Sequence, residues 1–309
     1  MLEKPRISPI NVPLRGTARV GCRFRSVSAK TLVNTQSGLK FATSPRWIHQ
    51  KLLFLDVHDR CIKSVDLKGT VRTVTALPYL PGSFGILADG CLIVGDALGR
   101  KLYRWEADSP TQMADLSNVA GFCLSEGIVD SCGGMYVADV GFDFLNPLVD
   151  PVSNGVIVYI STDGKSSVVA ENLYFPNGMT ISIDNKTLIV AESLGHRLTS
   201  FAIEGDGSLN DRRVWAQLQD EVKPEGICLD SAGAVWVAGA GPLALRVSEG
   251  GEIDQQVTSE RPVFATALGG PERRHLFLCA SDSNDPVITR QVSCATIDIA
   301  EVETPGREI

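Results

Sequence analysis

The chain has 309 residues, of which 44% are hydrophobic and 21% are charged, a composition typical of a globular protein with a sizeable core. Its net charge of −7 argues against a nucleic-acid partner, because binding phosphates requires clustered lysine and arginine. No apolar run approaches the roughly 20 residues needed to cross a bilayer, so we expect no membrane partner.

The first six residues mix both charges and are not followed by an apolar run, which is unlike a secretory signal. The eight cysteines are scattered without a CxxC pair or the spacing of metal ligands. We therefore expect a cytoplasmic location, where these cysteines stay reduced and pack as small apolar residues.

In chain order, residues 1–30 are expected to form an N-terminal extension, and residues 31–35 a strand. Six similar segments follow, each with a short apolar strand, a turn and a second strand that ends in a small or acidic residue. These segments are 44–56, 86–96, 127–139, 179–192, 226–238 and 266–280. They recur every roughly 40 to 50 residues, which is the blade period of a β-propeller.

Amphipathic stretches at 100–105, 155–160 and 197–203 predict a third strand, and tight-turn signals such as Asp163-Gly164 predict a fourth. The sequence therefore predicts an all-β fold, a six-bladed β-propeller with four-stranded blades over residues 31–300 and a polar C-terminal tail at 301–309. The sixth blade lacks one strand, so we expect the N-terminal strand at 31–35 to complete it and close the ring. A large β-sandwich is the alternative.

Loops that enter the innermost strands and loops that leave the second strands of a propeller open at the same end of its channel. The entering loops carry two hydroxyls, an amide and two carboxylates, from Thr43, Ser125, Asn177, Glu126 and Glu225. The leaving loops span 56–58, 139–143, 192–196 and 281–285, which include Asp143 and His196. We expect these groups to converge on a small polar pocket.

Glu126 and Glu225 are the candidate catalytic pair, because burial and mutual repulsion in a confined channel drive the pKa values of two carboxyls apart. One would then act as a base and the other as an acid. The alternative is that each accepts hydrogen bonds from loop amides and only fixes the channel. His196 is a third catalytic candidate, with a surface or supporting role as its alternative.

The chain resembles the SMP-30/gluconolactonase/LRE family across residues 31–290. The resemblance is carried by GLKFATSPRW at 38–47, FPNGM at 175–179, LIVAES at 188–193, PEGICLD at 224–230 and LGGPERR at 268–274. It implies a six-bladed propeller that holds one divalent cation, usually calcium or zinc, and often hydrolyses lactones. A related group of enzymes cleaves organophosphates.

The family's metal ligands are only partly kept. Thr43 stands where the family has Glu, Ser125 where it has Asn, and Glu126 follows in place of an Asp. Asn177 is kept, whereas Glu225 replaces an Asp. Calcium needs about six to eight oxygen ligands, with carboxylates supplying most of the affinity. We therefore expect the divalent cation to be weakly held or absent, with Asn177 and Glu225 as its ligands if it is retained.

These residues favour a hydrolase that acts on a lactone or a similar cyclic ester, a small-molecule substrate. Glu225 or Glu126 would activate water, while Asn177, Thr43 and Ser125 orient or polarise the carbonyl and Asp143 contributes to substrate binding. Two alternatives stay open: a metal-independent isomerase or cyclase acting on an intermediate of secondary metabolism, and a propeller that binds a ligand without catalysis.

Overall fold

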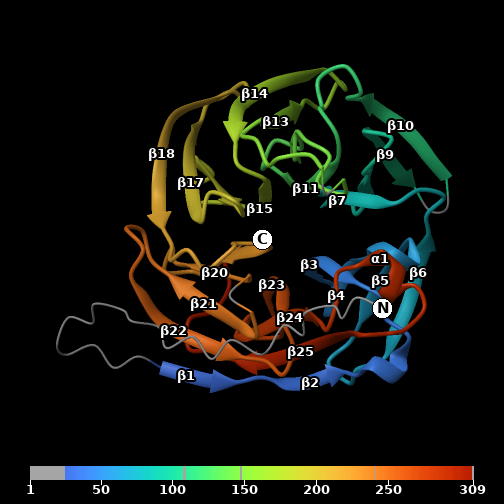
Figure 1. Cartoon of the computed structure of the whole chain (residues 1–309), viewed down its shortest axis with the longest axis vertical. Coiled ribbons are helices and arrows are strands. Elements are labelled where there is room, and N and C mark those ends of the chain that lie inside the picture. Colours follow the sequence, from blue (N-terminus) through green and yellow to red (C-terminus); the bar gives the residue numbers. More distant parts are fainter. Residues whose placement is uncertain (1–24, 107–108, 147, 240, 308–309) are drawn as a thin grey trace.

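A computed structural model describes residues 25–106, 109–146, 148–239 and 241–307 of the protein. Over these ranges the chain forms six sheets arranged as blades around a central channel (Figure 1). The predicted six-bladed all-β propeller is therefore confirmed. Residues 1–24, which make up most of the expected N-terminal extension, lie outside the described ranges. Within those ranges no helix is both long enough and apolar enough to cross a membrane.

Four blades are built from four consecutive antiparallel strands each. The first holds β3 (Ala42–Ile48), β4 (Lys51–Asp56), β5 (Cys61–Val65) and β6 (Val71–Ala76). The second holds β7 (Pro81–Ile86), β8 (Leu92–Asp96), β9 (Lys101–Glu106) and β10 (Ser109–Asp115). The third holds β11 (Leu124–Val129), β12 (Met135–Asp139), β13 (Gly155–Ile160) and β14 (Ser166–Leu173). The fourth holds β15 (Pro176–Ile181), β16 (Thr187–Glu192), β17 (Arg197–Ile203) and β18 (Leu209–Gln217).

The last two blades also take strands from the start of the chain. The fifth holds β19 (Ile227–Leu229), β20 (Val235–Val237), β21 (Leu243–Val247) and β22 (Ile253–Thr258), with β1 (Arg25–Ser28) at its edge. The sixth holds β23 (Val263–Gly269), β24 (His275–Ser281), β25 (Ala295–Glu301) and β2 (Lys30–Val33). Short helical turns are η1 (Thr35–Ser37), η2 (Val57–Asp59) and α1 (Pro286–Thr289).

Ring closure by an N-terminal strand is confirmed. Strand β2 pairs antiparallel with β25, so that Lys30 lies opposite Ile299 and Val33 opposite Ile297. Val33 is buried in the same hydrophobic cluster as Ile297. The outer strand of the sixth blade therefore comes from the beginning of the chain, and the inner strands from its end.

Strand β1 adds a fifth strand to the fifth blade, which the expected count of four per blade did not include. It pairs in parallel with β22, with Val27 opposite Val257. All four residues of β1 are exposed, so its attachment depends on backbone hydrogen bonds rather than on buried side chains.

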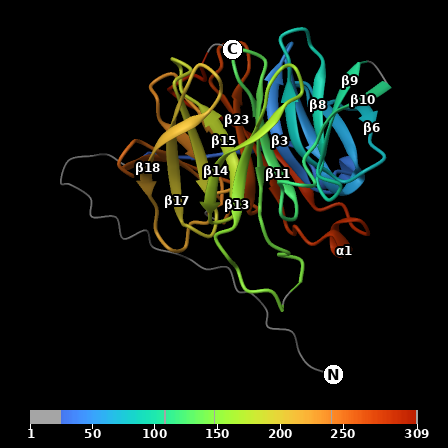
Figure 2. The same ribbon diagram turned by 90° about the horizontal axis from the view of Figure 1, so that it is seen from above.

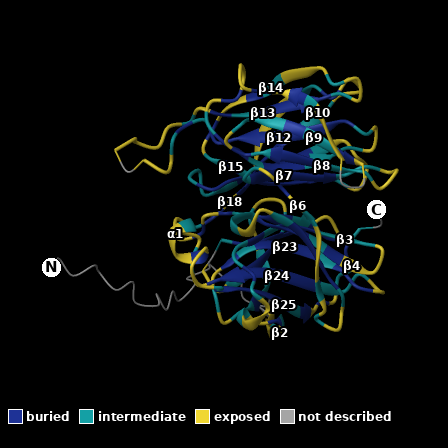
Figure 3. Ribbon diagram, turned by 90° about the vertical axis from the view of Figure 1, so that its right-hand side faces the viewer, coloured by how far each residue is buried: buried dark blue, intermediate teal, exposed yellow. Residues whose placement is uncertain are grey.

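The hydrophobic core is divided among the spaces between neighbouring blades. One cluster joins Tyr136 and Ile157 of the third blade to Met179 and Phe201 of the fourth. Figure 3 shows this distribution, with buried residues along the strands and exposed residues in the connecting loops. Because every blade packs against two others in the closed ring, the starts of the inner strands are held at fixed relative positions.

The two ends of the channel carry different segments. The loop that joins β12 to β13 and the short helix α1 project from one end (Figures 2 and 3). At the other end, the C-terminal segment crosses near the end of β15, where the Arg307 guanidinium donates to the carbonyl of Ile181 at 2.9 Å. Gly306 also pairs with Asp230 in an isolated bridge. The segment expected to be a polar tail therefore packs against the propeller as far as Arg307.

Candidate active site

Residues near the starts of the six inner strands occupy equivalent positions in the sheets. In β3, β7, β11, β15 and β23 the pairing register shifts directly after the first paired residues, as a β-bulge does. The fifth blade repeats the order of the fourth, with Pro-Glu-Gly before β19 matching Pro-Asn-Gly at the start of β15. The residues at this shared position are Thr43, Gly82, Ser125, Asn177, Glu225 and Phe264. We call them the ring residues.

The glycines that follow two ring residues are required by the close approach of neighbouring blades. A Cβ added at Gly178 would meet the carbonyl oxygen of Glu225 at 2.3 Å, and one added at Gly226 would meet the Cβ of Ala265 at 2.6 Å. The Gly178 amide donates to that Glu225 carbonyl at 3.1 Å. The Asn-Gly and Glu-Gly pairs therefore bring the side chains of Asn177 and Glu225 together across two blades.

Glu225 has the most perturbed carboxyl at this end of the channel. The Asn177 side-chain amide donates to its Oε2 at 2.5 Å. Burial raises the pKa of Glu225 to about 7, although the hydrogen bond from Asn177 and the charge of Lys223 both act to lower it. A half-buried carboxyl with so few compensating donors exchanges a proton near neutral pH.

Ser193 supports this pair and was not singled out from the sequence. Its hydroxyl donates to the carbonyl of Pro224 at 2.6 Å, and it accepts a weaker hydrogen bond from the Asn177 amide at 3.3 Å. Ser193 follows the last residue of β16, so it fixes the Asn177 side chain relative to the loop that carries Glu225. Only its place in the Ala-Glu-Ser stretch of the sequence pointed to the site.

The two hydroxyl-bearing ring residues differ in what they offer a ligand. Ser125 donates its proton to the carbonyl of Pro176 at 2.8 Å, so that proton is already used within the protein. The Thr43 hydroxyl has no hydrogen-bond partner among the described residues, and the side chain is only partly buried. Thr43 is therefore the freer donor for a substrate oxygen.

Glu126 and Glu225 have different hydrogen-bond partners, although we expected the two carboxylates to interact. It is 5% exposed and accepts from Ser44 at 3.0 Å and from the backbone amide of Gly127 at 3.0 Å. Arg46 pairs with it at 3.1 Å and also donates to the carbonyl of Gly127. These contacts favour the alternative in which Glu126 fixes the channel, and its role in proton transfer stays a prediction.

The acids at the ends of the second strands hold loops rather than face a ligand. The buried carboxylate of Asp139 accepts from the backbone amides of Gly121 and Phe122, at 2.8 and 3.2 Å. Asp56 and Glu192 accept in the same way from the loops before β3 and β15, which confers rigidity on the segments that carry the ring residues. These acids lie at the end of the channel that carries the ring residues, as we expected from the sequence, and their carboxylates already accept from backbone amides.

Two further predicted site residues are engaged in local structure. The Asp143 carboxylate accepts from the amide of Leu145 at 3.1 Å, within the loop between β12 and β13. His196 lies in the turn between β16 and β17, and its Nδ1 is 3.0 Å from the carbonyl oxygen of Val222. Their roles in substrate binding and catalysis stay predictions.

The donor set at the ring is poor for a divalent cation. It offers one carboxylate, one amide and two hydroxyls. Calcium sites use six to eight oxygens, with carboxylates as the main source of affinity. Across the described parts of the chain, no group of three or more His, Cys, Asp or Glu side chains is arranged to hold a metal ion. The ring residues therefore do not fit a tightly held calcium or zinc ion.

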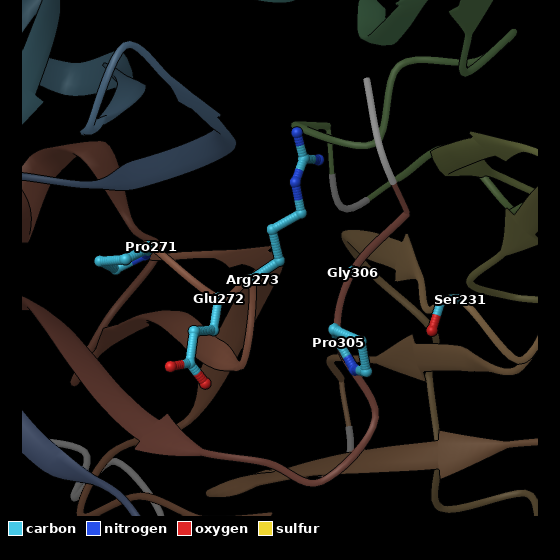
Figure 4. A pocket seen from close by; sticks show the side chains of 6 residues that line it. All are labelled: Ser231, Pro271, Glu272, Arg273, Pro305 and Gly306. Atoms are coloured by element: carbon cyan, nitrogen blue, oxygen red, sulfur yellow. The ribbon is translucent and has the colours of Figure 1, made fainter.

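The opposite end of the channel contains two cavities. The larger has a volume of about 820 Å³ and is lined by Arg46, Trp47, Arg273 and Arg307, among others. The smaller, of about 480 Å³, lies beside the C-terminal segment and is lined by Ser231, Pro271, Glu272, Arg273, Pro305 and Gly306 (Figure 4). Neither is lined by a ring residue, and Arg46 with its partner Glu126 lies between the two ends.

The protein is similar in sequence to curated relatives. Regucalcin of Danio rerio is 22% identical over 253 residues, which cover 77% of this chain and 82% of the relative. Lactonase drp35 of Staphylococcus aureus is 26% identical over 184 residues, which cover 54% of this chain and 53% of that protein. The match to drp35 thus spans only about half of each protein.

Solved structures share the fold. A luciferin-regenerating enzyme superposes with a TM-score of 0.73 at 19% identity, covering 90% of this chain and 97% of that one. A calcium-binding protein, regucalcin, from Agrobacterium tumefaciens superposes with a TM-score of 0.72 at 16% identity, covering 92% and 99%. The model of the SMP-30/gluconolactonase/LRE-like region matches residues 41–282, well over half of the chain. The chain therefore belongs to the SMP-30/gluconolactonase/LRE family.

Proposed function

We propose that this protein is a hydrolase that opens a lactone or a similar cyclic ester, with Glu225 as the general base. The observation that carries the proposal is a half-buried carboxyl, with its pKa raised to about 7, at the ring of inner-strand starts. General bases are most effective when their pKa lies near the working pH. Membership of a family that includes lactonases supports the choice of substrate class.

Three ring residues have separate roles in the proposed reaction. Glu225 takes a proton from a water molecule whose oxygen attacks the ester carbonyl carbon. The Thr43 hydroxyl donates to the carbonyl oxygen as negative charge develops there. Asn177 holds the Glu225 carboxylate in position through its amide. The ring C–O bond then breaks, and the proton held by Glu225 passes to the leaving oxygen, which gives a hydroxy acid.

We further propose that this chemistry proceeds without a tightly held divalent cation. One relative is described as a calcium-binding protein, and Asn177 with Glu225 would be the ligands of any ion retained here. The donors at the ring fall short of the six to eight oxygens that calcium uses, and the proton and the ion compete for the same oxygens of the one carboxyl. We also propose that the protein is cytoplasmic and acts on small molecules of secondary metabolism.

The test is turnover of a lactone panel with and without a chelator, in water enriched in oxygen-18. Hydrolysis places one labelled oxygen in the carboxyl group of the product, whereas isomerisation or cyclisation incorporates none. We expect labelled product at a rate that EDTA leaves unchanged, and elemental analysis that finds well under one ion per chain. Loss of turnover in EDTA with recovery on adding calcium would contradict metal independence, and binding without turnover would favour the ligand-binding alternative.

The isomerase or cyclase alternative is favoured by one observation, the aromatic side chains at the end of the channel that carries the ring residues. Phe264 is itself a ring residue and contacts Phe41 with ring centroids 5.1 Å apart. Apolar walls suit a hydrophobic intermediate that rearranges without water. Unlabelled product from such a substrate in the same experiment would support this alternative over hydrolysis.

A further inference from the structure

We propose that the active site takes an apolar cyclic ester, one that carries an alkyl chain or an aromatic group rather than the several hydroxyls of a sugar lactone. The inference rests on the proposed function for the cyclic ester and on the surroundings of the ring residues for its apolar part. Apolar cyclic esters are thus the one class of lactone that we propose for this site.

The phenylalanines of the chain are concentrated at this end of the channel. Of the 11 phenylalanines in the sequence, six lie in the segments that begin inner strands or in the loop that follows β12. They are Phe41, Phe122, Phe142, Phe144, Phe175 and Phe264. We call these six the aromatic rim. They come from the first, third, fourth and sixth blades or the segments before them, so their clustering results from the fold.

The rim residues contact one another in two groups. In one, Phe41 meets Phe264 edge to face, and stacks on His58 with centroids also 5.1 Å apart. In the other, Phe144 contacts Phe175 at 5.2 Å and Phe122 at 5.7 Å. Edge-to-face and stacked arrangements are the favoured geometries of aromatic pairs, and each ring contributes a large apolar area.

The backbone at Phe175 is strained where it leads into the ring. Phe175 has φ = 57°, in the left-handed region that a bulky residue rarely adopts. It directly precedes Pro176-Asn177, and its carbonyl accepts from the amide of Ser193. Strained conformations persist where the surrounding structure enforces them, and they are enriched at ligand sites. Phe175 thus stands two residues before Asn177 in the chain, with its ring packed against Phe144 at 5.2 Å.

Further apolar side chains extend the rim outward on the same end. The loop between β12 and β13 exposes Leu145 at 57% and Leu148 at 91%, and α1 exposes Val287 at 66%. Both segments project from this end of the propeller (Figure 2). These exposed side chains add apolar area at this end of the channel, beside the charged Asp143 of the same loop and Asp285 at the start of α1.

The polar groups at the ring are too few for a polyhydroxylated substrate. Ser125 has donated its proton to Pro176, and the Asn177 amide is directed at Glu225 and Ser193. A buried hydroxyl left without a partner lowers affinity by roughly tenfold or more, so each additional sugar hydroxyl acts against binding. The same surroundings favour each methylene that is removed from water.

The test measures kcat/KM for γ-butyrolactone, γ-hexalactone, γ-octalactone and γ-decalactone beside D-glucono-δ-lactone. We expect kcat/KM to rise about threefold for each added methylene, and the sugar lactone to be a poorer substrate than γ-octalactone. Binding of alkyl-substituted tetrahydrofurans, which have the ring but no carbonyl to attack, is measured in parallel by calorimetry.

Phe144→Ser removes one aromatic side chain of the rim. Because Phe144 lies at an exposed loop position, we expect the variant to fold. We expect the ratio of kcat/KM for γ-decalactone to that for γ-butyrolactone to fall about tenfold, as expected for losing the apolar contact of about two methylenes. Val214→Ser is the matched control, because Val214 is also an exposed apolar residue, 55% exposed, on the outer strand β18. It should leave the ratio as in the wild type.

The outcomes separate this inference from the proposed function. Hydrolysis of every lactone without dependence on chain length, or with the sugar lactone preferred, contradicts the apolar class while hydrolysis stands. Tetrahydrofuran binding that tightens with chain length, without turnover of any lactone, supports the apolar class and contradicts hydrolysis. Absence of both turnover and binding contradicts both.

Discussion

At the residue scale, the environment of Glu225 sets its chemistry. The loop before β19 takes the carboxyl out of water, and Asn177 is its hydrogen-bond donor. The desolvation outweighs this donor and the charge of Lys223, so the pKa rises to about 7. Glu126, in contrast, is paired with Arg46 and accepts from Ser44. The two glutamates of the channel therefore differ in their surroundings, Glu225 with a single amide donor and Glu126 with an ion pair.

The raised pKa of Glu225 predicts a specific dependence of stability on pH. Both states carry the protonated carboxyl below pH 4.5, the ordinary value of a glutamate. Between that pH and about 7 the unfolded chain loses the proton while the folded protein keeps it, so stability falls as pH rises through this window. Glu225→Gln removes this loss and should raise the free energy of unfolding at pH 8 by about 1–3 kcal/mol, after allowance for partial exposure.

Urea denaturation of the variant and the wild type at several pH values measures this effect. The difference between them should be near zero at pH 4 and reach its full size above about pH 7. Glu221→Gln, in an exposed glutamate of the same loop, is the control and should show no such difference. A Glu225→Gln protein no more stable than the wild type at pH 8 would show that the carboxyl is not destabilised in its ionised form.

The departures from the family's metal ligands also belong to the residue scale. Thr43 and Ser125 supply hydroxyls where the family has a carboxylate and an amide. Restoring the family's residues by Thr43→Glu with Ser125→Asn adds a carboxylate to the ring that contains Glu225 and Asn177. We expect calcium to raise the thermal midpoint of this double variant by several degrees while leaving that of the wild type unchanged, because an ion that binds only the folded state stabilises it.

Differential scanning fluorimetry with calcium and with EDTA measures the shift. Thr43→Gln with Ser125→Asn is the matched control, since it has the same size but lacks the added charge. Equal stabilisation of the wild type by calcium would mean that the native ring already binds the ion and that the hydroxyls were undervalued as ligands.

At the element scale, the two N-terminal strands contribute unequally. Strand β1 pairs at the edge of the fifth blade with all its residues exposed. Strand β2 buries Val33 in a cluster with Phe54 of the first blade and Phe277 of the sixth. The closing strand therefore joins the beginning and the end of the chain through apolar packing, which β1 does not do.

Truncation separates these contributions. Deleting residues 1–29 removes β1 and should cost about 1 kcal/mol or less, whereas deleting 1–34 also removes β2 and should cost several kcal/mol, because it exposes a sheet edge and leaves part of a core cluster open. Chemical denaturation of the two truncated proteins measures the difference. Equal, small effects would contradict closure of the ring by β2.

At the scale of the whole molecule, most of the architecture could be predicted from the repeat. The alternating strands and turns indicated six blades, and the missing strand of the last blade pointed to β2. Strand β1 was not predicted, because Arg25-Ser26-Val27-Ser28 has a single apolar residue and no alternating pattern. The docking of the C-terminal segment was not predicted either, because Arg307 reaches the carbonyl of Ile181 only once the ring is closed.

The site could be predicted in its position more than in its contacts. The residues before the inner strands identified Asn177 and Glu225 as neighbours, which agrees with their hydrogen bond, whereas a contact of Thr43 with them stays a prediction. Pairing of Arg46 with Glu126 joins positions 80 residues apart, and nothing local in the sequence indicates it. The aromatic rim was missed for the same reason, since its members are scattered along the chain and gather only in the folded ring.

The most direct test is the pH dependence of kcat/KM for the best lactone of the panel, in the wild type and in Glu225→Gln. We expect the wild-type value to rise with pH and to level off above about 7, as the carboxyl of Glu225 loses its proton. The variant, shown to be folded by circular dichroism, should be about 100-fold less active and lack this inflection. A folded Glu225→Gln protein with wild-type kcat/KM and the same inflection would contradict the assignment of Glu225 as the base.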